Sequence, residues 1–164
     1  MRRLLVALAL LAFAAPISAQ AGKPSFVGTW TMDSARSQSE GSPLPAAIVW
    51  TIAQRGDTLI WDREIINEAG SAKLVSKVTV GMDGKPWPNK APQADGTSRD
   101  AAYALSWEGA TMVVTITSEI EGTPIVQIDR LTKSADGATL TVMRDLTVDG
   151  EPYAKATMVF AKRS

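Results

Sequence analysis

The chain has 164 residues, with 17 basic and 17 acidic side chains and neither cysteine nor histidine. The lack of histidine excludes Ser-His-Asp and Cys-His nucleophiles, zinc sites of the usual His/Cys kind and histidine-ligated haem. The lack of cysteine excludes disulfides, and a balanced charge without basic clusters argues against nucleic acid as a partner. We therefore expect no cofactor and no metal site.

The first residues have the pattern of a secretory signal peptide. Arg2 and Arg3 precede twelve apolar residues, from Leu4 to Ala15, which are too few to span a bilayer core of ~30 Å as a helix. Small residues at the −3 and −1 positions predict cleavage after Ala21, with a cut after Ala19 as the alternative. An uncleaved N-terminal anchor is the competing interpretation.

Cleavage after Ala21 separates a signal peptide (1–21) from a mature chain of 143 residues (22–164) with a net charge of −2. This length suits a single domain with one hydrophobic core. No later segment is long and apolar enough to cross a membrane, so we expect no stable membrane insertion. The sequence thus predicts a periplasmic or secreted protein, which we expect to be a monomer.

The segment that follows the leader alternates with the period of a half-buried strand. Phe26, Gly28, Trp30 and Met32 fall on one face of it, and smaller or polar residues fall on the other. The next stretch, 33–45, is polar and carries proline, which predicts a connecting loop with a lid as the alternative.

Eight further segments alternate in the same way and are separated by turn signals such as Asp-Gly. These predicted strands are Ala46–Arg55, Thr58–Ile66, Ala72–Gly81, Ser98–Trp107, Thr111–Ile120, Ile125–Thr132, Thr139–Val148 and Tyr153–Ala161. The segment 86–96 is irregular, and its three prolines exclude a central strand there. No helical periodicity follows the leader. We predict an all-β fold, a single antiparallel up-and-down β-barrel of about eight to ten strands, with a two-sheet sandwich as the alternative.

Three blocks of the sequence resemble secreted bacterial lipocalin-like proteins of unassigned function, within the calycin-type barrels. They are Phe26-Val27-Gly28-Thr29-Trp30 with Ser34-Ala35-Arg36-Ser37, then Asp83-Gly84-Lys85-Pro86-Trp87-Pro88, then the stretch 130–142. The resemblance covers residues 24–164 and implies a barrel with a central cavity that binds a ligand.

The resemblance also implies a structural role for residues at one end of the barrel. Gly28 and Trp30 would close that end, and an arginine from a late strand would pack over the indole of Trp30. Arg130 is the first candidate for that arginine, with Arg163 and Arg144 as alternatives.

Two arginines fall on strand faces that we expect to point inward: Arg63 and Arg144. A buried guanidinium is costly unless it is paired. We hypothesise that both hold the carboxylate or phosphate head group of a ligand, with Tyr103 and Ser118 as further polar contacts. The alternatives are a structural ion pair, or a strand end where the side chain reaches water.

The tryptophans of the predicted strands also fall on apolar faces. Trp61 and Trp107 are candidates for the wall of a cavity that takes a flat apolar ligand. Core packing, in which an indole fills space and its N–H group finds an acceptor, is the competing interpretation.

We predict an exported lipocalin-like protein that binds a small apolar or amphipathic molecule in its barrel. One alternative is a histidine-free barrel enzyme of the isomerase or cyclase type, although no paired carboxylate motif is visible on one face and no catalytic residue is predicted. Another is a protein-interaction or inhibitor module that works through its loops.

Asp83-Gly84 and Asp149-Gly150 are too short to form calcium loops and are explained by hairpin turns.

Overall fold

The computed structural model describes residues 22–67, 70, 73–93 and 97–163. The predicted signal peptide lies outside these residues. Over the described ranges the chain forms ten β-strands, and these ranges contain no helix with the length and hydropathy that a membrane crossing requires. The strands are β1 (Gly28–Glu40), β2 (Ala47–Arg55), β3 (Thr58–Ile66), β4 (Lys73–Gly81), β5 (Trp87–Pro92), β6 (Ser98–Glu108), β7 (Thr111–Ile120), β8 (Thr123–Lys133), β9 (Thr139–Val148) and β10 (Glu151–Lys162).

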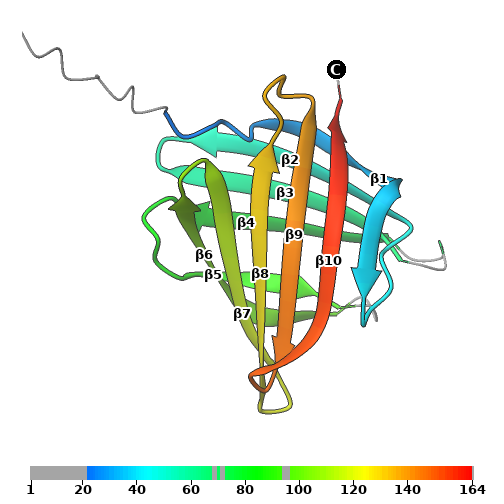
Figure 1. Cartoon of the computed structure of the whole chain (residues 1–164). Coiled ribbons are helices and arrows are strands. Elements are labelled where there is room, and N and C mark those ends of the chain that lie inside the picture. Colours follow the sequence, from blue (N-terminus) through cyan, green and yellow to red (C-terminus); the bar gives the residue numbers. More distant parts are fainter. Residues whose placement is uncertain (1–21, 68–69, 71–72, 94–96, 164) are drawn as a thin grey trace, which may run out of the picture.

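All ten strands belong to one antiparallel sheet that curls into a nearly closed barrel (Figure 1). The strand order is β4-β3-β2-β1-β10-β9-β8-β7-β6-β5, so the first strand pairs with the last. In Figure 1, β7 to β10 cross in front of β2 to β4 at a steep angle. This topology confirms the predicted all-β, up-and-down barrel and excludes the two-sheet sandwich.

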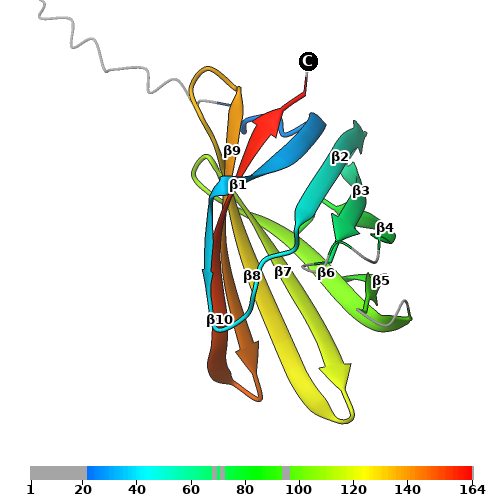
Figure 2. The same cartoon turned by 90° about the vertical axis from the view of Figure 1, so that its right-hand side faces the viewer.

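The first strand is longer than its alternation indicates, and the prediction of a loop over 33–45 is wrong for most of that stretch. The register between β1 and β10 shifts between Asp33 and Gln38, after which pairing resumes as far as Glu40. At the shift, the Ser37 hydroxyl donates to the carbonyl of Asp33 (2.7 Å) and accepts from the N–H of Val159 (3.0 Å). The strand therefore bends instead of ending, as Figure 2 shows.

The segment predicted to be irregular, 86–96, contains the short strand β5. This strand pairs only with β6 and stands at one end of the sheet order. Prolines are tolerated at a sheet edge because an edge strand does not need every backbone N–H group for pairing. The prediction that 86–96 holds no central strand is therefore confirmed, and the prediction that the whole segment is irregular is wrong.

Side chains close the seam between β4 and β5, the two ends of the sheet. Asn89 on β5 accepts a hydrogen bond from the N–H of Thr79 on β4 and donates one to the carbonyl of the same residue, both at 2.9 Å. The indole of Trp87 lies against Gly81, where a Cβ atom would come within 2.4 Å of the ring nitrogen. Asn89 therefore supplies two hydrogen bonds between β4 and β5, where a ladder of backbone hydrogen bonds is missing.

The apolar core fills the end of the barrel at which β1 begins. Trp30 is fully buried there and donates from its indole nitrogen to the carbonyl of Phe26 at 2.9 Å. Deeper in the core, Trp50 stacks on Phe160 at 4.3 Å between ring centroids and meets Trp61 edge-on at 4.7 Å. This core therefore forms the closed end of the barrel, and a cavity can lie above it.

Arg130 does not take the place that the resemblance implies for it. The cation over the Trp30 ring is Lys162, whose ammonium lies 5.8 Å from the ring centroid. Arg130 instead forms ion pairs with Asp145 (2.9 Å) and Glu108 (3.7 Å). The physical reason is the pleat, because Arg130 falls between the inward positions of β8, which are Asp129 and Leu131.

The two other arginines considered for the place over Trp30 also have different positions. Arg163 donates to the hydroxyl of Thr31 at 2.8 Å, and Arg144 lines a cavity in the other half of the barrel. Gly28 does have a packing role at the closed end, because a Cβ atom there would lie 3.0 Å from the side chain of Lys162.

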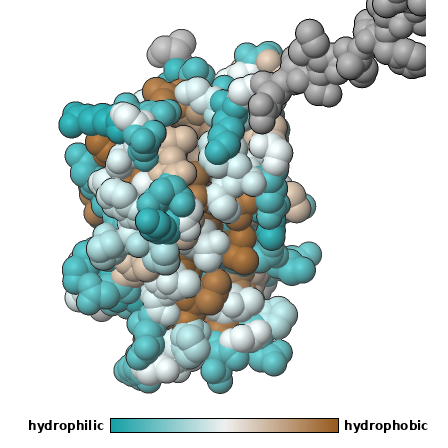
Figure 3. Space-filling view, turned by 90° about the vertical axis from the view of Figure 1, so that its left-hand side faces the viewer, coloured by the Kyte–Doolittle hydropathy of each residue, from teal (hydrophilic) through white to brown (hydrophobic). Residues whose placement is uncertain are grey.

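The outer surface is mainly polar. On the side that Figure 3 shows, polar side chains cover most of the surface and apolar ones gather in a narrow band. Among the described residues, four large apolar ones are exposed away from the barrel cavity, one before β1 and the others on β3, β4 and β9: Val27, Ile66, Val75 and Met143. Scattered residues of this kind are usual on soluble proteins.

Candidate functional site

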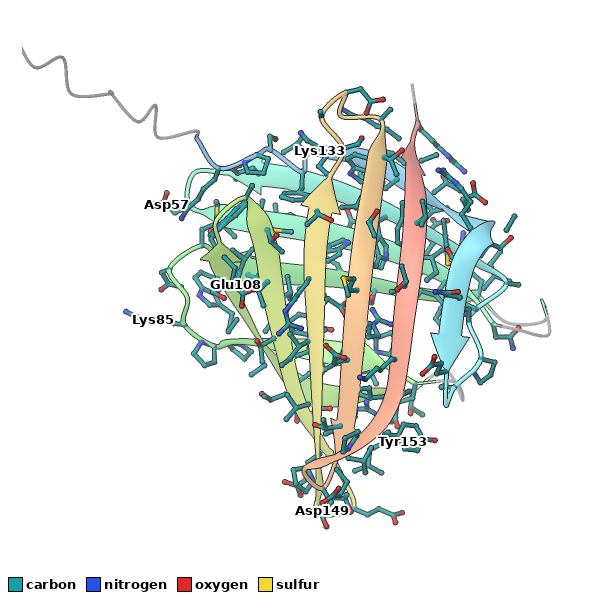
Figure 4. All side chains as sticks on the ribbon, viewed as in Figure 1. Asp57, Lys85, Glu108, Lys133, Asp149 and Tyr153 are labelled. Atoms are coloured by element: carbon teal, nitrogen blue, oxygen red, sulfur yellow. The ribbon has the colours of Figure 1, made fainter. Side chains whose placement is uncertain are left out.

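A cavity of about 600 Å³ occupies the half of the barrel that the core leaves free. It lies toward the end that carries the β7–β8 and β9–β10 turns, where Figure 4 labels Asp149 and Tyr153. Its apolar wall includes Ile48, Trp50, Ile65, Ile116, Ile125, Leu146 and Val148. Its polar lining includes Arg63, Arg99, Tyr103, Ser118, Gln127 and Arg144.

Arg63 is the most deeply placed cation of this cavity, with an exposed fraction of only 8 %. It points inward from β3, and its Nε atom donates to the hydroxyl of Ser76, the residue directly opposite on β4, at 3.1 Å. Its Nη2 atom donates to the buried hydroxyl of Tyr103 on β6 at 2.9 Å. The guanidinium also lies 5.5 Å from the centroid of the tyrosine ring, a distance at which a cation is attracted by the ring.

These contacts fix Arg63 without neutralising it. Among the described residues, no carboxylate pairs with its guanidinium. A guanidinium has five N–H groups, and the two bonds above use only two of them. Burying a cation without a counter-charge is unfavourable, so an anionic group placed beside these free N–H groups would offset the cost.

Arg144 differs from Arg63 because it has a carboxylate partner. Asp129 on β8 is directly opposite in the register, is 2 % exposed, and accepts from both Nε and Nη2 of Arg144 at 2.8 Å. Burial acts to lower the pKa of the Arg144 guanidinium, and the charge and hydrogen bonds of Asp129 outweigh it, so the pKa is raised. Arg144 therefore forms a structural ion pair with Asp129, which is the alternative interpretation that the sequence analysis gives for this residue.

A third arginine, Arg99 on β6, lies nearer the open end and is half-buried. Its Nε atom donates to the hydroxyl of Ser118 on β7 at 3.2 Å. No carboxylate among the described residues pairs with it either. Sequence reasoning missed Arg99, although the alternation places it on the same face of β6 as Tyr103.

Four of the six residues that we predicted to contact a ligand meet in this cavity: Arg63, Tyr103, Ser118 and Arg144. Trp61 and Trp107 do not line it. Trp61 packs in the core against Trp50, and Trp107 lies 5.9 Å from Phe26 near the closed end. Trp50 is the tryptophan that faces the cavity.

The charges along the cavity wall favour an anion. Within the described ranges, Arg63 and Arg99 carry positive charge without a carboxylate partner, and the charge of Arg144 is balanced by Asp129. Glu121 also lines the cavity, but it is exposed at the β7–β8 turn, where water and salt screen its charge. No cluster of metal-ligating side chains is found in the described ranges.

The nearly closed meander, with a packed core at one end and a cavity at the other, has the fold of a lipocalin-like β-barrel. Two solved structures resemble it at a level that supports this statement. One is a secretory abundant heat soluble (SAHS) protein from Ramazzottius varieornatus, with a TM-score of 0.51 and 14 % identity, covering 84 % of this chain and 95 % of that chain.

The other is a mutant of the fluorescent protein UnaG, with a TM-score of 0.50 and 15 % identity, covering 85 % of this chain and 96 % of that chain. At such identities the likeness concerns the fold alone. No protein-family model matches the chain, and no curated protein sequence matches it either.

Proposed function

We propose that the protein binds a small amphipathic molecule with an anionic head group in its barrel cavity. The observation that carries this proposal is Arg63, a buried guanidinium that Tyr103 and Ser76 hold in the cavity wall without a carboxylate partner among the described residues. The anionic head would occupy the N–H groups that these two bonds leave free. Such charge-assisted bonds are roughly twice as strong as those between neutral groups.

The rest of the cavity suits an apolar body. Trp50, Ile48 and Ile116 line the wall, and apolar surface that leaves water on binding contributes about 25 cal/mol per Å². A volume of about 600 Å³ lies within the ~300–1,000 Å³ that small-molecule sites occupy. Pro45, from the connection between β1 and β2, also lines the cavity, so this connection would contact the ligand.

A histidine-free enzyme is the second candidate, because an arginine, a tyrosine and a carboxylate do gather in this half of the barrel. The carboxylate is Asp129, and it already accepts two hydrogen bonds from Arg144 and one from Gln127. These bonds occupy the oxygens that a general base needs to accept a proton. Binding without chemical conversion therefore accounts better for the cluster.

We also propose that the protein acts outside the cytoplasm, as a monomer released by cleavage after Ala21 or Ala19. The basic start, the short apolar run and the small residues before the cut support export. Expression of the full chain in a bacterial host, followed by N-terminal sequencing of the exported product, tests this proposal. A start at Gly22 or Gln20 is expected, and a product that begins at Met1 and stays with the membrane would contradict it.

The binding proposal is tested by calorimetric titration of the chain from residue 22 with two ligands of equal length, hexadecanoic acid and hexadecan-1-ol. The acid should bind more tightly because only its carboxylate can pair with Arg63. Loss of a hydrogen bond to a charged group costs about 1.5–3 kcal/mol, so Arg63→Gln should weaken binding of the acid by about tenfold to a hundredfold. Binding of the alcohol should change little.

Arg55→Gln is the matched control, because Arg55 is exposed at the end of β2 and does not line the cavity. This variant should bind both ligands as the parent does. The proposal fails if neither ligand binds, or if Arg63→Gln weakens the acid and the alcohol equally. Mass spectrometry of the recovered ligands separates binding from catalysis, since an enzyme would return a changed molecule.

A further inference from the structure

We propose that the cavity is built for a ligand with two anionic groups joined by an apolar spacer, one group held at Arg63 and Tyr103 and the other at Arg99 and Ser118. This inference rests on the proposed function and specifies the chemical class of the ligand. It starts from the difference among the three arginines that line the cavity. Arg144 has its own carboxylate, whereas the other two lack one among the described residues.

The two unpaired arginines are held in the same manner. Each uses its Nε atom to donate to a serine hydroxyl on a neighbouring strand, Arg63 to Ser76 at 3.1 Å and Arg99 to Ser118 at 3.2 Å. In both cases the serine fixes the guanidinium plane without adding negative charge. For Arg99 both terminal nitrogens, with four N–H groups, remain available to a ligand.

The register of the sheet sets how far apart the two anionic groups would lie. Ser118 is directly opposite Ala101, midway between Arg99 and Tyr103 on the inward face of β6. The bond to Ser118 therefore draws the Arg99 guanidinium toward the level of Ala101. That level is two residues, or about 7 Å of strand, from the level of Tyr103.

The surface between these two points is apolar and small. Ile116, opposite Tyr103 on β7, lines the cavity there, and Ala101 is buried on β6 between the two points without lining the cavity itself. A short apolar spacer could lie against this surface and join the two groups. Glu121, beyond Arg99 at the exposed turn, is the carboxylate that the described part of the chain contributes to the lining, and it would disfavour a second anionic group outside Arg99.

Paired ligands that differ only in the second group test this inference. The chain from residue 22 is titrated with monocarboxylic acids and with the α,ω-dicarboxylic acids of equal length, from hexanedioic to hexadecanedioic acid. At the best spacer length the diacid should bind about tenfold more tightly than the monoacid. This is the lower end of the range for a hydrogen bond to a charged group, because Arg99 is half-buried.

The Arg99→Gln variant should abolish this advantage of the diacid, so that the ratio of the two affinities falls to about one. Arg63→Gln should weaken both ligands, and Arg55→Gln should affect neither. The inference is overturned if monoacids and diacids bind equally at every length, or if Arg99→Gln weakens both by the same factor. In either case binding of the monoacid through Arg63 would still stand, so failure of the inference is distinct from failure of the proposed function.

Discussion

Arg144 and Asp129 lie directly opposite each other on β9 and β8, joined by two hydrogen bonds of 2.8 Å. Gln127, two residues before Asp129 on the same inward face, donates a further bond of 3.0 Å to the carboxylate. Because Asp129 balances the charge of Arg144, Arg63 is the buried arginine of the cavity that has no carboxylate partner among the described residues. The ion pair also makes this part of the cavity wall electrically neutral.

Removal of Asp129 should destabilise the barrel because it leaves the Arg144 guanidinium largely buried and unpaired. Breaking a buried ion pair from one side costs about 3–5 kcal/mol, and we expect Asp129→Asn to lower the free energy of unfolding by about 3 kcal/mol in urea titrations. Asp62→Asn is the control, because its partner Lys77 is 3.5 Å away on the surface and such pairs contribute about 0–1 kcal/mol. Equal losses in the two variants would contradict the buried role of the Asp129–Arg144 pair.

Trp50 should report ligand binding by its fluorescence, because its ring faces the cavity. Titration of the parent chain with hexadecanoic acid should change the tryptophan emission. In Trp50→Phe the change should be largely lost, whereas Trp107→Phe, altered near the closed end, should keep it. Calorimetry on the same samples establishes that both variants still bind. If the response disappears in Trp107→Phe and persists in Trp50→Phe, the ligand binds near the closed end of the barrel and not in the cavity.

Alternation in the sequence predicts this fold well because one face of each strand is apolar along most of its length. The bounds of β3, β7 and β9 are those that the pattern indicates, and the turns between strands follow the glycine signals. The pattern fails at residues 34–37, where a bend within β1 interrupts the regular pairing with β10. It also fails at β5, where an edge strand admits prolines that a central strand would not.

The site is harder to predict than the fold for a related reason. Alternation tells which side chains point inward, and it placed Arg63, Tyr103 and Arg144 correctly. It does not tell how high along the barrel a residue lies, so Trp107 was assigned to the cavity although it packs near the closed end. The pairing of Arg144 with Asp129 depends on the register between two strands, which no single strand encodes.

The β8–β9 turn should show a carboxylate with a depressed pKa. The Ser134 hydroxyl and the N–H of Ala138 donate to Asp136 and lower the pKa of its carboxyl group below the ordinary 3.8. In the Ser134→Ala variant this pKa, followed by NMR titration, should move back toward the ordinary value. Because the folded-state pKa is depressed, the contribution to stability is present above the unfolded pKa and is lost as the pH falls through the folded pKa.

The loss of stability in Ser134→Ala should therefore be largest at neutral pH and should shrink as the pH falls below about 3.8. Thermal unfolding of parent and variant across this range measures the difference. Ser98→Ala serves as the control, since Ser98 is exposed at the start of β6 and makes no contact with Asp136. A pKa of Asp136 that does not move when the hydroxyl is removed would contradict this assignment.

The seam between β4 and β5 should be the place where the barrel opens most easily. The two bonds from Asn89 to the backbone of Thr79 take the place of a ladder there, and a single hydrogen bond contributes about 0.5–1.5 kcal/mol. In Asn89→Ala, the N–H group of Thr79 loses its acceptor, so its hydrogen exchange should speed up by about twofold to tenfold. Amides on β9, far from the seam, should keep their protection. Lys90→Ala is the control, because Lys90 is the next residue of the strand and its side chain is exposed. This variant should leave the exchange of the Thr79 amide unchanged. If the Thr79 amide still exchanges slowly in Asn89→Ala, the side chain of Asn89 does not close the seam.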